Sequence, residues 1–135
     1  MSHWKCFYHI VWATKHRQPT ITVLWETLIF ETVKTKCTEQ KCTLLAINGT
    51  EDHIHLAVNI PPQIAVAKFI ATIKGASSHE VNKSIALEEK FRWQTGYSVH
   101  TFGERALKTV IDYIERQKEH HAEGTLYDGL EPDED

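Results

Sequence analysis

Two patterns of hydrophobic and polar residues follow one another along this chain, one with the spacing of strands and one with the spacing of helices. Residues 4–14 are aromatic and β-branched without interruption, which predicts a long strand that is largely buried. Residues 41–48 and 53–60 predict two further strands. The polar residues 49–52 between them are typical of a hairpin turn.

Three other segments repeat apolar residues at the spacing of one helix face. The first helix is predicted from Thr20 or Thr22, either of which can cap its N-terminus, to about Thr38. The second is predicted over residues 63–83 and the third over residues 104–121. Each pattern is long enough to form an amphipathic helix that buries one side.

The order of these elements predicts the fold class. Residues 91–93 and 97–101 predict a last strand, or a hairpin that turns at Thr95 and Gly96. The order is then β-α-β-β-α-β-α, which indicates an α+β, ferredoxin-like fold with an antiparallel sheet and two helices on one face. The final helix is an addition to that core. We expect one domain over residues 1–123, followed by an acidic C-terminal tail over residues 124–135.

Composition is that of an ordinary globular domain. The chain has 135 residues, of which 41% are hydrophobic and 24% charged. It contains no apolar run of the roughly 18 residues that span a membrane, and its first residues lack the apolar core of a signal peptide. We therefore expect a cytoplasmic protein without membrane association. The cysteines, Cys6, Cys37 and Cys42, are odd in number and predict reduced thiols rather than a disulfide framework.

The charge is distributed unevenly along the chain. Residues 1–118 carry all 15 lysines and arginines and 11 acidic residues, a net charge of +4, whereas residues 119–135 carry 7 acidic residues and no basic one. The overall net charge of −3 therefore hides a mildly basic body that can meet phosphates. The acidic tail either competes with phosphates or only aids solubility.

His53 and His55 stand two positions apart in a predicted strand. Side chains alternate between the two faces of a strand, so both imidazoles point to the side opposite Ile54 and Leu56, which face the core. Such a pair can bind a metal ion, and a pair that is only solvated or hydrogen-bonded is the competing interpretation. Asp52 either orients one of these histidines or simply shapes the turn.

Tyr113 and Gln117 stand four positions apart in the last predicted helix, which places them on one face. The amide oxygen of Gln117, together with His53 and His55, would leave open positions on a hard divalent ion such as Mg²⁺ or Mn²⁺. Such an ion would assist attack of the phenol on a phosphodiester, giving a 5′-phosphotyrosine and a free 3′-hydroxyl. A tyrosine that only packs on an amphipathic helix is the alternative.

These residues stand in a longer series of ordered motifs. The supporting segments are residues 8–15, 74–78 and 93–97. With them, the sequence resembles the single-tyrosine HUH transposases of small bacterial insertion sequences and their repeat-associated domesticated relatives. The resemblance implies a homodimer that cleaves and rejoins single-stranded DNA beside hairpins, with Tyr113 as the nucleophile and His53, His55 and Gln117 as metal ligands. In that family the tyrosine helix of one subunit can complete the histidine site of the other.

Several other side chains are candidates for contact with DNA. Basic residues can bind phosphates, Trp93 can stack on unpaired bases, and the two serines can contact the backbone, although solvated charges and core packing explain them equally well. The candidates are Lys15, Arg17, Lys74, Ser77, Ser78, Arg92 and Trp93.

Two rival functions remain open on the sequence. One is a non-catalytic or domesticated hairpin-DNA-binding protein, against which the complete set of four site residues argues. The other is a histidine-dependent phosphodiesterase or nucleotide hydrolase, which usually needs a further histidine near the pair or a second such motif.

Overall fold

A four-stranded antiparallel sheet forms the centre of the part of the chain that the structure, a computed structural model, describes: residues 3–84 and 90–119. Its order is β2-β3-β1-β4. The strands are β1 (Phe7–Ala13), β2 (Thr43–Gly49), β3 (His53–Asn59) and β4 (Ser98–Phe102). The long strand predicted at the N-terminus thus lies inside the sheet, paired with β3 on one side and β4 on the other.

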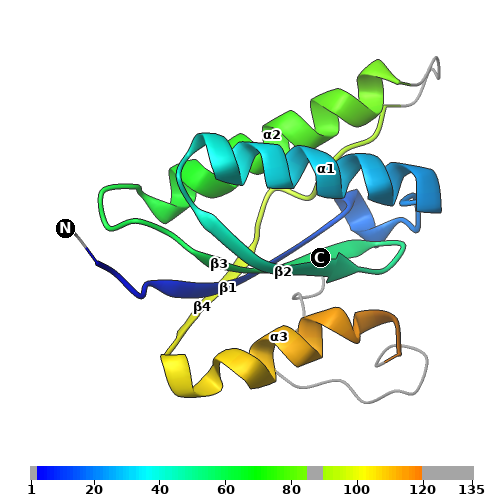
Figure 1. Cartoon of the computed structure of the whole chain (residues 1–135). Coiled ribbons are helices and arrows are strands. Elements are labelled where there is room, and N and C mark those ends of the chain that lie inside the picture. Colours follow the sequence, from blue (N-terminus) through cyan, green and yellow to red (C-terminus); the bar gives the residue numbers. More distant parts are fainter. Residues whose placement is uncertain (1–2, 85–89, 120–135) are drawn as a thin grey trace.

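The helices lie on both faces of this sheet (Figure 1). The helices α1 (Val23–Glu39) and α2 (Val66–Lys83) pack against each other on one face. On the other face α3 (Leu107–Glu115) packs against β2 and β3. Short 3-10 turns, Lys15–Arg17 and Glu104–Ala106, precede α1 and α3. The predicted ferredoxin-like α+β fold with an added C-terminal helix is confirmed.

The two faces of the sheet bury different amounts of apolar surface. Beneath α1 and α2 lies the larger core, to which the strands contribute fully buried residues such as Ile10, Ile54 and Leu56. Beneath α3 lies a smaller cluster that comprises Ala46, Ala57, Val110 and Ile114. Because the strand residues of this second cluster are small, the axis of α3 can lie close to the sheet.

A register shift in β2 determines which residues of β2 pair with those of β3. The irregularity lies between Leu44 and Ala46, after which Asn48 stands opposite His55 and Gly49 opposite Ile54. Such bulges rotate the following side chains relative to the partner strand. As a result, the side chain of Asn48 reaches the carbonyl oxygen of Glu115 at the end of α3, with a distance of 2.9 Å.

The hairpin predicted around Thr95 and Gly96 is wrong. Between residues 90 and 97 the structure forms one isolated β-bridge, from Trp93 to Thr14, and no strand. The carbonyl oxygens of Gln94, Thr95 and Gly96 accept hydrogen bonds from Nζ of Lys74, at 2.7, 3.4 and 3.0 Å. A lysine of α2 therefore satisfies the backbone groups that a second strand would otherwise have paired.

The last helix is shorter than predicted. It ends at Glu115, and Arg116 has φ −102° and ψ 21°, after which residues 117–119 are helical again. Tyr113 and Gln117 therefore do not lie on one continuous helix, as the sequence had suggested. Residues 120 and 121, where the helix was predicted to end, lie outside the described residues, as does the predicted tail over 124–135.

The cysteines are free thiols, as predicted. Burial, reinforced by the neighbouring Cys42, raises the pKa of Cys37 to about 12. Burial also raises the pKa of Cys42 above its usual value. Both thiols therefore stay protonated near neutral pH and are poor nucleophiles. Among the described residues, no helix is both long and apolar enough to cross a membrane.

We expect Gly49→Ala to destabilise the protein by about 1–3 kcal/mol, because the site has no room for a methyl group. A Cβ at this position would collide with the carbonyl oxygen of His53 and lie 2.9 Å from Cδ1 of Ile54. Urea denaturation followed by circular dichroism measures the change. Gly75→Ala is the matched control: its Cβ meets nothing within 4 Å in the middle of α2, and we expect a gain of about 0.5–1 kcal/mol. Equal stability of the two variants would contradict the steric account.

Candidate active site

The sequence-predicted site residues come together between β3 and the C-terminal end of α3. Nε2 of His53 lies 3.4 Å from Oε1 of Gln117. The rings of His53 and His55 have centroids 5.0 Å apart, and the ring of Tyr113 lies edge-on to His55 at 6.1 Å. One chain supplies all four side chains. The structure thus forms this arrangement without a residue from a second subunit.

The strand and the helix are held together by apolar contacts and by two polar ones. Val110 and Ile114, one turn apart on α3, pack on the alanines of β2 and β3. Asn48 donates a hydrogen bond to the carbonyl oxygen of Glu115 at 2.9 Å and accepts one from Nζ of Lys118 at 2.8 Å. Nζ of Lys118 also lies 3.0 Å from a carboxylate oxygen of Glu26 on α1. The segment that carries Gln117 is therefore anchored on both sides.

His53 is oriented by a carboxylate. Its Nδ1 lies 2.6 Å from Oδ1 of Asp52 and 3.0 Å from the hydroxyl of Thr50, and the guanidinium of Arg17 lies 3.3 Å from the same carboxylate. Burial by itself raises the pKa of Asp52, but the hydrogen bond from His53 and the charge of Arg17 outweigh it and lower the pKa to about 2. Asp52 is therefore ionised near neutral pH. It belongs to the turn and also orients His53, so both of its predicted roles are combined.

A third histidine, His9, lies within hydrogen-bonding distance of His55, and it was not among the site residues predicted from the sequence. Nε2 of His9 lies 2.9 Å from Nδ1 of His55, and the two rings stack with centroids 5.1 Å apart. His9 is only 1% exposed. A signal existed in the sequence: His9 alternates with Ile10 in the first predicted strand and so faces the same side of the sheet as the histidine pair. Nothing in the sequence, however, indicated which strand would lie beside it.

The donor atoms suit a hard divalent cation. A histidine whose Nδ1–H donates to a carboxylate presents the lone pair of Nε2, and the amide oxygen of Gln117 also presents lone pairs. Two such acceptors 3.4 Å apart repel each other unless a proton or a cation lies near both. Among the described residues no group of three or more His, Cys, Asp and Glu side chains could hold a metal ion, and the Gln117 amide is outside those residue types. Two imidazoles and one amide oxygen fit Mg²⁺ or Mn²⁺.

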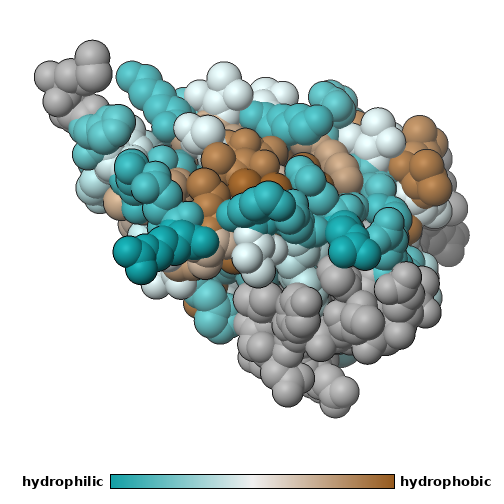
Figure 2. All heavy atoms as spheres, turned by 60° about the horizontal axis from the view of Figure 1, so that its bottom comes forward, coloured by the Kyte–Doolittle hydropathy of each residue, from teal (hydrophilic) through white to brown (hydrophobic). Residues whose placement is uncertain are grey.

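The four side chains are enclosed in this conformation. His53, His55 and Gln117 are 0% exposed and Tyr113 is 2% exposed. The outer surface of α3 is polar, with an ion pair between Lys108 and Asp112 at 3.0 Å. Figure 2, turned so that the α3 side comes forward, shows mostly hydrophilic residues on this face with an apolar patch among them.

Of the seven predicted DNA contacts, all but Ser77 lie at least partly on the surface. Lys15 and Arg92 are exposed, and their backbones are joined by a hydrogen bond from Lys15 N to Arg92 O at 3.0 Å. Ser78 is partly buried on α2. Arg17 is partly exposed but engaged with Asp52. Of these four side chains, Lys15 and Arg92 are the ones that a phosphate can reach from solvent.

The other three predicted contacts, Lys74, Ser77 and Trp93, are engaged with other parts of the protein, and only Ser77 is fully buried. Ser77 is 0% exposed, and its hydroxyl donates to the carbonyl of Ile73 at 2.7 Å and accepts from the indole of Trp93 at 3.0 Å. Trp93 packs edge-on against Trp12 at 5.6 Å. Lys74 holds the loop at residues 94–96, and burial lowers its pKa. In this conformation Ser77 offers DNA no exposed group, because its hydroxyl is buried and satisfied within the core.

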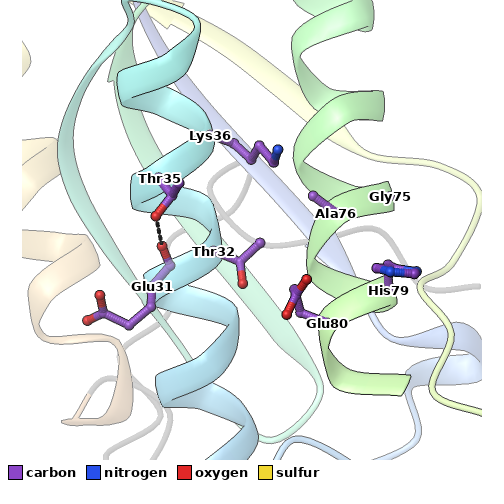
Figure 3. Close-up of a pocket in the computed structure, with 8 residues that line it drawn as sticks. All are labelled: Glu31, Thr32, Thr35, Lys36, Gly75, Ala76, His79 and Glu80. Carbon is purple, nitrogen blue, oxygen red and sulfur yellow. Dashed lines mark hydrogen bonds between the residues drawn. The ribbon is translucent and has the colours of Figure 1, made fainter. Parts of the chain in front are cut away.

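A surface groove of about 520 Å³ lies away from these residues, between α1 and α2 (Figure 3). Its lining mixes acidic, basic and small side chains: Glu31, Thr32, Thr35, Lys36, Gly75, Ala76, His79 and Glu80. The hydroxyl of Thr35 donates to the carbonyl of Glu31 in its own helix at 3.0 Å. Its lining includes neither a tyrosine nor any of the four site residues gathered beside α3, so the candidate active site remains the one beneath α3.

The fold and this site together are those of a single-tyrosine transposase. The chain belongs to the family of IS200-like transposases, whose family model matches residues 2–117. The match therefore includes β1, the histidine pair, Tyr113 and Gln117.

Curated relatives agree with this assignment. The transposase for insertion sequence element IS200 of Salmonella typhimurium is 32% identical over 123 residues, covering 87% of this chain and 80% of that protein. The ISDra2 transposase TnpA of Deinococcus radiodurans is 24% identical over 115 residues, covering 82% of each.

Two solved structures have a similar fold. A putative transposase from Deinococcus radiodurans superposes with a TM-score of 0.69 and 26% identity, covering 86% of this chain and 93% of that one. A REP-associated tyrosine transposase bound to a REP hairpin superposes with a TM-score of 0.68 and 14% identity, covering 90% and 74%.

Proposed function

We propose that this transposase cleaves and rejoins single-stranded DNA through a 5′-phosphotyrosine on Tyr113, with a divalent metal held by His53, His55 and Gln117. One observation carries the proposal: Nε2 of His53 and Oε1 of Gln117 converge to 3.4 Å while Tyr113 lies against His55. A phenol, two imidazoles and an amide oxygen gathered in one place have a chemical use that a purely structural cluster would not need.

The chemistry is a transesterification. The phenol oxygen of Tyr113 bonds to phosphorus as the bond from phosphorus to the 3′ oxygen breaks, and the proton lost by the phenol is balanced by the one gained by the 3′-hydroxyl. A bound Mg²⁺ or Mn²⁺ would polarise the phosphodiester and offset the charge that develops on it. Because one phosphodiester replaces another, little bond energy is lost, and a different 3′-hydroxyl can reverse the reaction to join new ends.

The substrate we propose is single-stranded DNA with hairpins. Family membership supports a DNA substrate, and a protein of the same fold is described bound to a REP hairpin. The exposed Lys15 and Arg92, neighbours through a backbone hydrogen bond, offer positive charge for phosphates. We further propose that the protein works as a homodimer, although one chain already holds all four site residues. Size-exclusion chromatography with light scattering measures that state.

Substrate entry requires a change in what covers the site. A phosphodiester cannot reach side chains that are 0–2% exposed, so part of the chain that encloses them moves when DNA binds. The polar anchors of the α3 end, from Asn48 and Lys118, are exposed hydrogen bonds that exchange readily with water.

The proposed function is tested with single-stranded oligonucleotides that carry the palindromes flanking the gene. We expect a protein–DNA adduct that survives denaturing electrophoresis in Mg²⁺ or Mn²⁺ and is absent in EDTA. The same sequences as perfect duplexes should form none. Absence of an adduct with every flanking palindrome and both metals, from folded protein, would contradict the proposal.

A second candidate function is hairpin-DNA binding without cleavage. The enclosure of all four site residues favours it, since a protein that only binds DNA has no need to open the site. It predicts a gel shift with the flanking hairpins, together with no adduct in any metal.

A further inference from the structure

We propose that His9 is a positioning residue for the metal ligand His55: it accepts the Nδ1 proton of His55 and so keeps Nε2 available for the cation. The inference rests on the proposed function and deepens it, by assigning a role to a residue outside the set of ligands. His9 belongs to β1, whereas the ligands belong to β3 and to the α3 end.

The contact between the two histidines is close and enclosed. Nε2 of His9 lies 2.9 Å from Nδ1 of His55, and the rings are stacked with an interplanar angle of 19°. His9 is 1% exposed and His55 is 0% exposed. Burying an imidazole costs free energy unless it is hydrogen-bonded, so a polar side chain here has a specific use that an apolar residue would not serve.

The positions of the protons follow from the chemistry of imidazole. A neutral imidazole carries one N–H and one lone pair, on different nitrogens. When Nε2 of His55 offers its lone pair to a cation, its proton must be on Nδ1. The atom 2.9 Å away must then accept that proton, so His9 carries its own proton on Nδ1 and presents the lone pair of Nε2.

The two ligand histidines are therefore supported in different ways. Nδ1 of His53 faces the Asp52 carboxylate at 2.6 Å, whereas Nδ1 of His55 faces a neutral ring. A carboxylate makes its histidine a more basic ligand, while a neutral acceptor fixes orientation and tautomer without adding charge. A site built this way keeps more net positive charge for the phosphodiester than one with two carboxylates.

Three substitutions separate this role from mere packing. His9→Phe keeps a stacked ring and removes the acceptor. His9→Gln restores an acceptor near the position of Nε2, and His9→Asn carries the same amide one bond too short to reach it. His100→Phe is the matched control, because His100 stands opposite His9 in β4, on the same face of the sheet, but is exposed.

The readout is Mn²⁺ affinity of the full chain, measured by calorimetry and by the electron spin resonance of free Mn²⁺, with thermal unfolding recorded for each variant. We expect His9→Phe and His9→Asn to bind Mn²⁺ about 10–100-fold more weakly, and His9→Gln and His100→Phe to stay near wild type. At saturating Mn²⁺ the adduct should return in His9→Phe, because the residue acts through the ligand and not on the DNA.

The outcomes are distinguishable. Wild-type protein that binds no Mn²⁺ would overturn the proposed metal site itself. Wild-type binding with unchanged affinity in His9→Phe would overturn only the role of His9. Equal loss in the Gln and Asn variants would overturn it as well, since it would indicate disturbed packing. If His9→Phe fails to fold, the Gln and Asn pair decides the question alone.

Discussion

Tyr113→Phe should form no covalent adduct with hairpin-flanked DNA, a loss of about 10³-fold or more relative to wild type, because the substitution removes the oxygen that we propose as the nucleophile. The ring stays, so the edge-on contact with His55 at 6.1 Å and the burial of the side chain are retained. We therefore expect DNA binding in gel-shift assays and the thermal unfolding midpoint to change little. Denaturing electrophoresis of labelled DNA measures the adduct.

Tyr97→Phe is the matched control for this experiment. Tyr97 is 45% exposed and directly follows the loop that Lys74 holds, outside the group of four buried site residues. It loses the same hydroxyl, and we expect wild-type adduct formation. An undiminished adduct in Tyr113→Phe, or an adduct lost only in Tyr97→Phe, would show that another group is the nucleophile.

Gln117→Leu should weaken Mn²⁺ binding and adduct formation by about 100-fold or more, because it removes one of the three proposed donor atoms and leaves an apolar group of similar size in its place. Gln117 is 0% exposed, and its Oε1 lies 3.4 Å from Nε2 of His53. The fold should persist, since a buried leucine costs no unsatisfied polar group. Calorimetric titration with Mn²⁺ and the adduct assay measure the two effects.

Gln117→Glu provides the counterpart. The carboxylate keeps an oxygen donor at the same reach and adds a negative charge, so Mn²⁺ affinity should be retained or increased. Chelation by EDTA followed by added Mn²⁺ should abolish and then restore the wild-type adduct. Equal Mn²⁺ affinity in the Leu and Glu variants would remove Gln117 from the ligand set and would leave the nucleophile assignment intact.

Local patterns in the sequence were sufficient to predict most of the strands and helices of the fold. The uninterrupted aromatic and β-branched run in residues 4–14, the alternation in residues 53–60 and the helical spacing in residues 63–83 are short-range properties, and the structure has β1, β3 and α2 there. The opposite directions of Ile54 and His55 also follow from strand geometry alone, and Ile54 does lie in the larger core.

The predictions from sequence were wrong where a side chain distant in the sequence donates a hydrogen bond to a backbone carbonyl. Nothing local shows that Lys74 would hold the loop at residues 94–96, so residues 91–93 and 97–101 were predicted as a strand or as a hairpin, and only the strand that became β4 formed. Nothing local shows that Asn48 would hold the carbonyl of Glu115, next to the point where α3 is interrupted. In both cases the partner is contributed by another element of the fold.

The sequence by itself determined the chemical types in the site and the faces they occupy. Two imidazoles share one side of a strand because its period is two, and a phenol and an amide follow each other at helical spacing. Only the tertiary structure decided that β1 would bring His9 against His55, and that α3 of the same chain would bring Gln117 to His53. Those distances depend on strand order, on the register shift in β2 and on the small alanines beneath α3, which are long-range packing properties that no local spacing encodes.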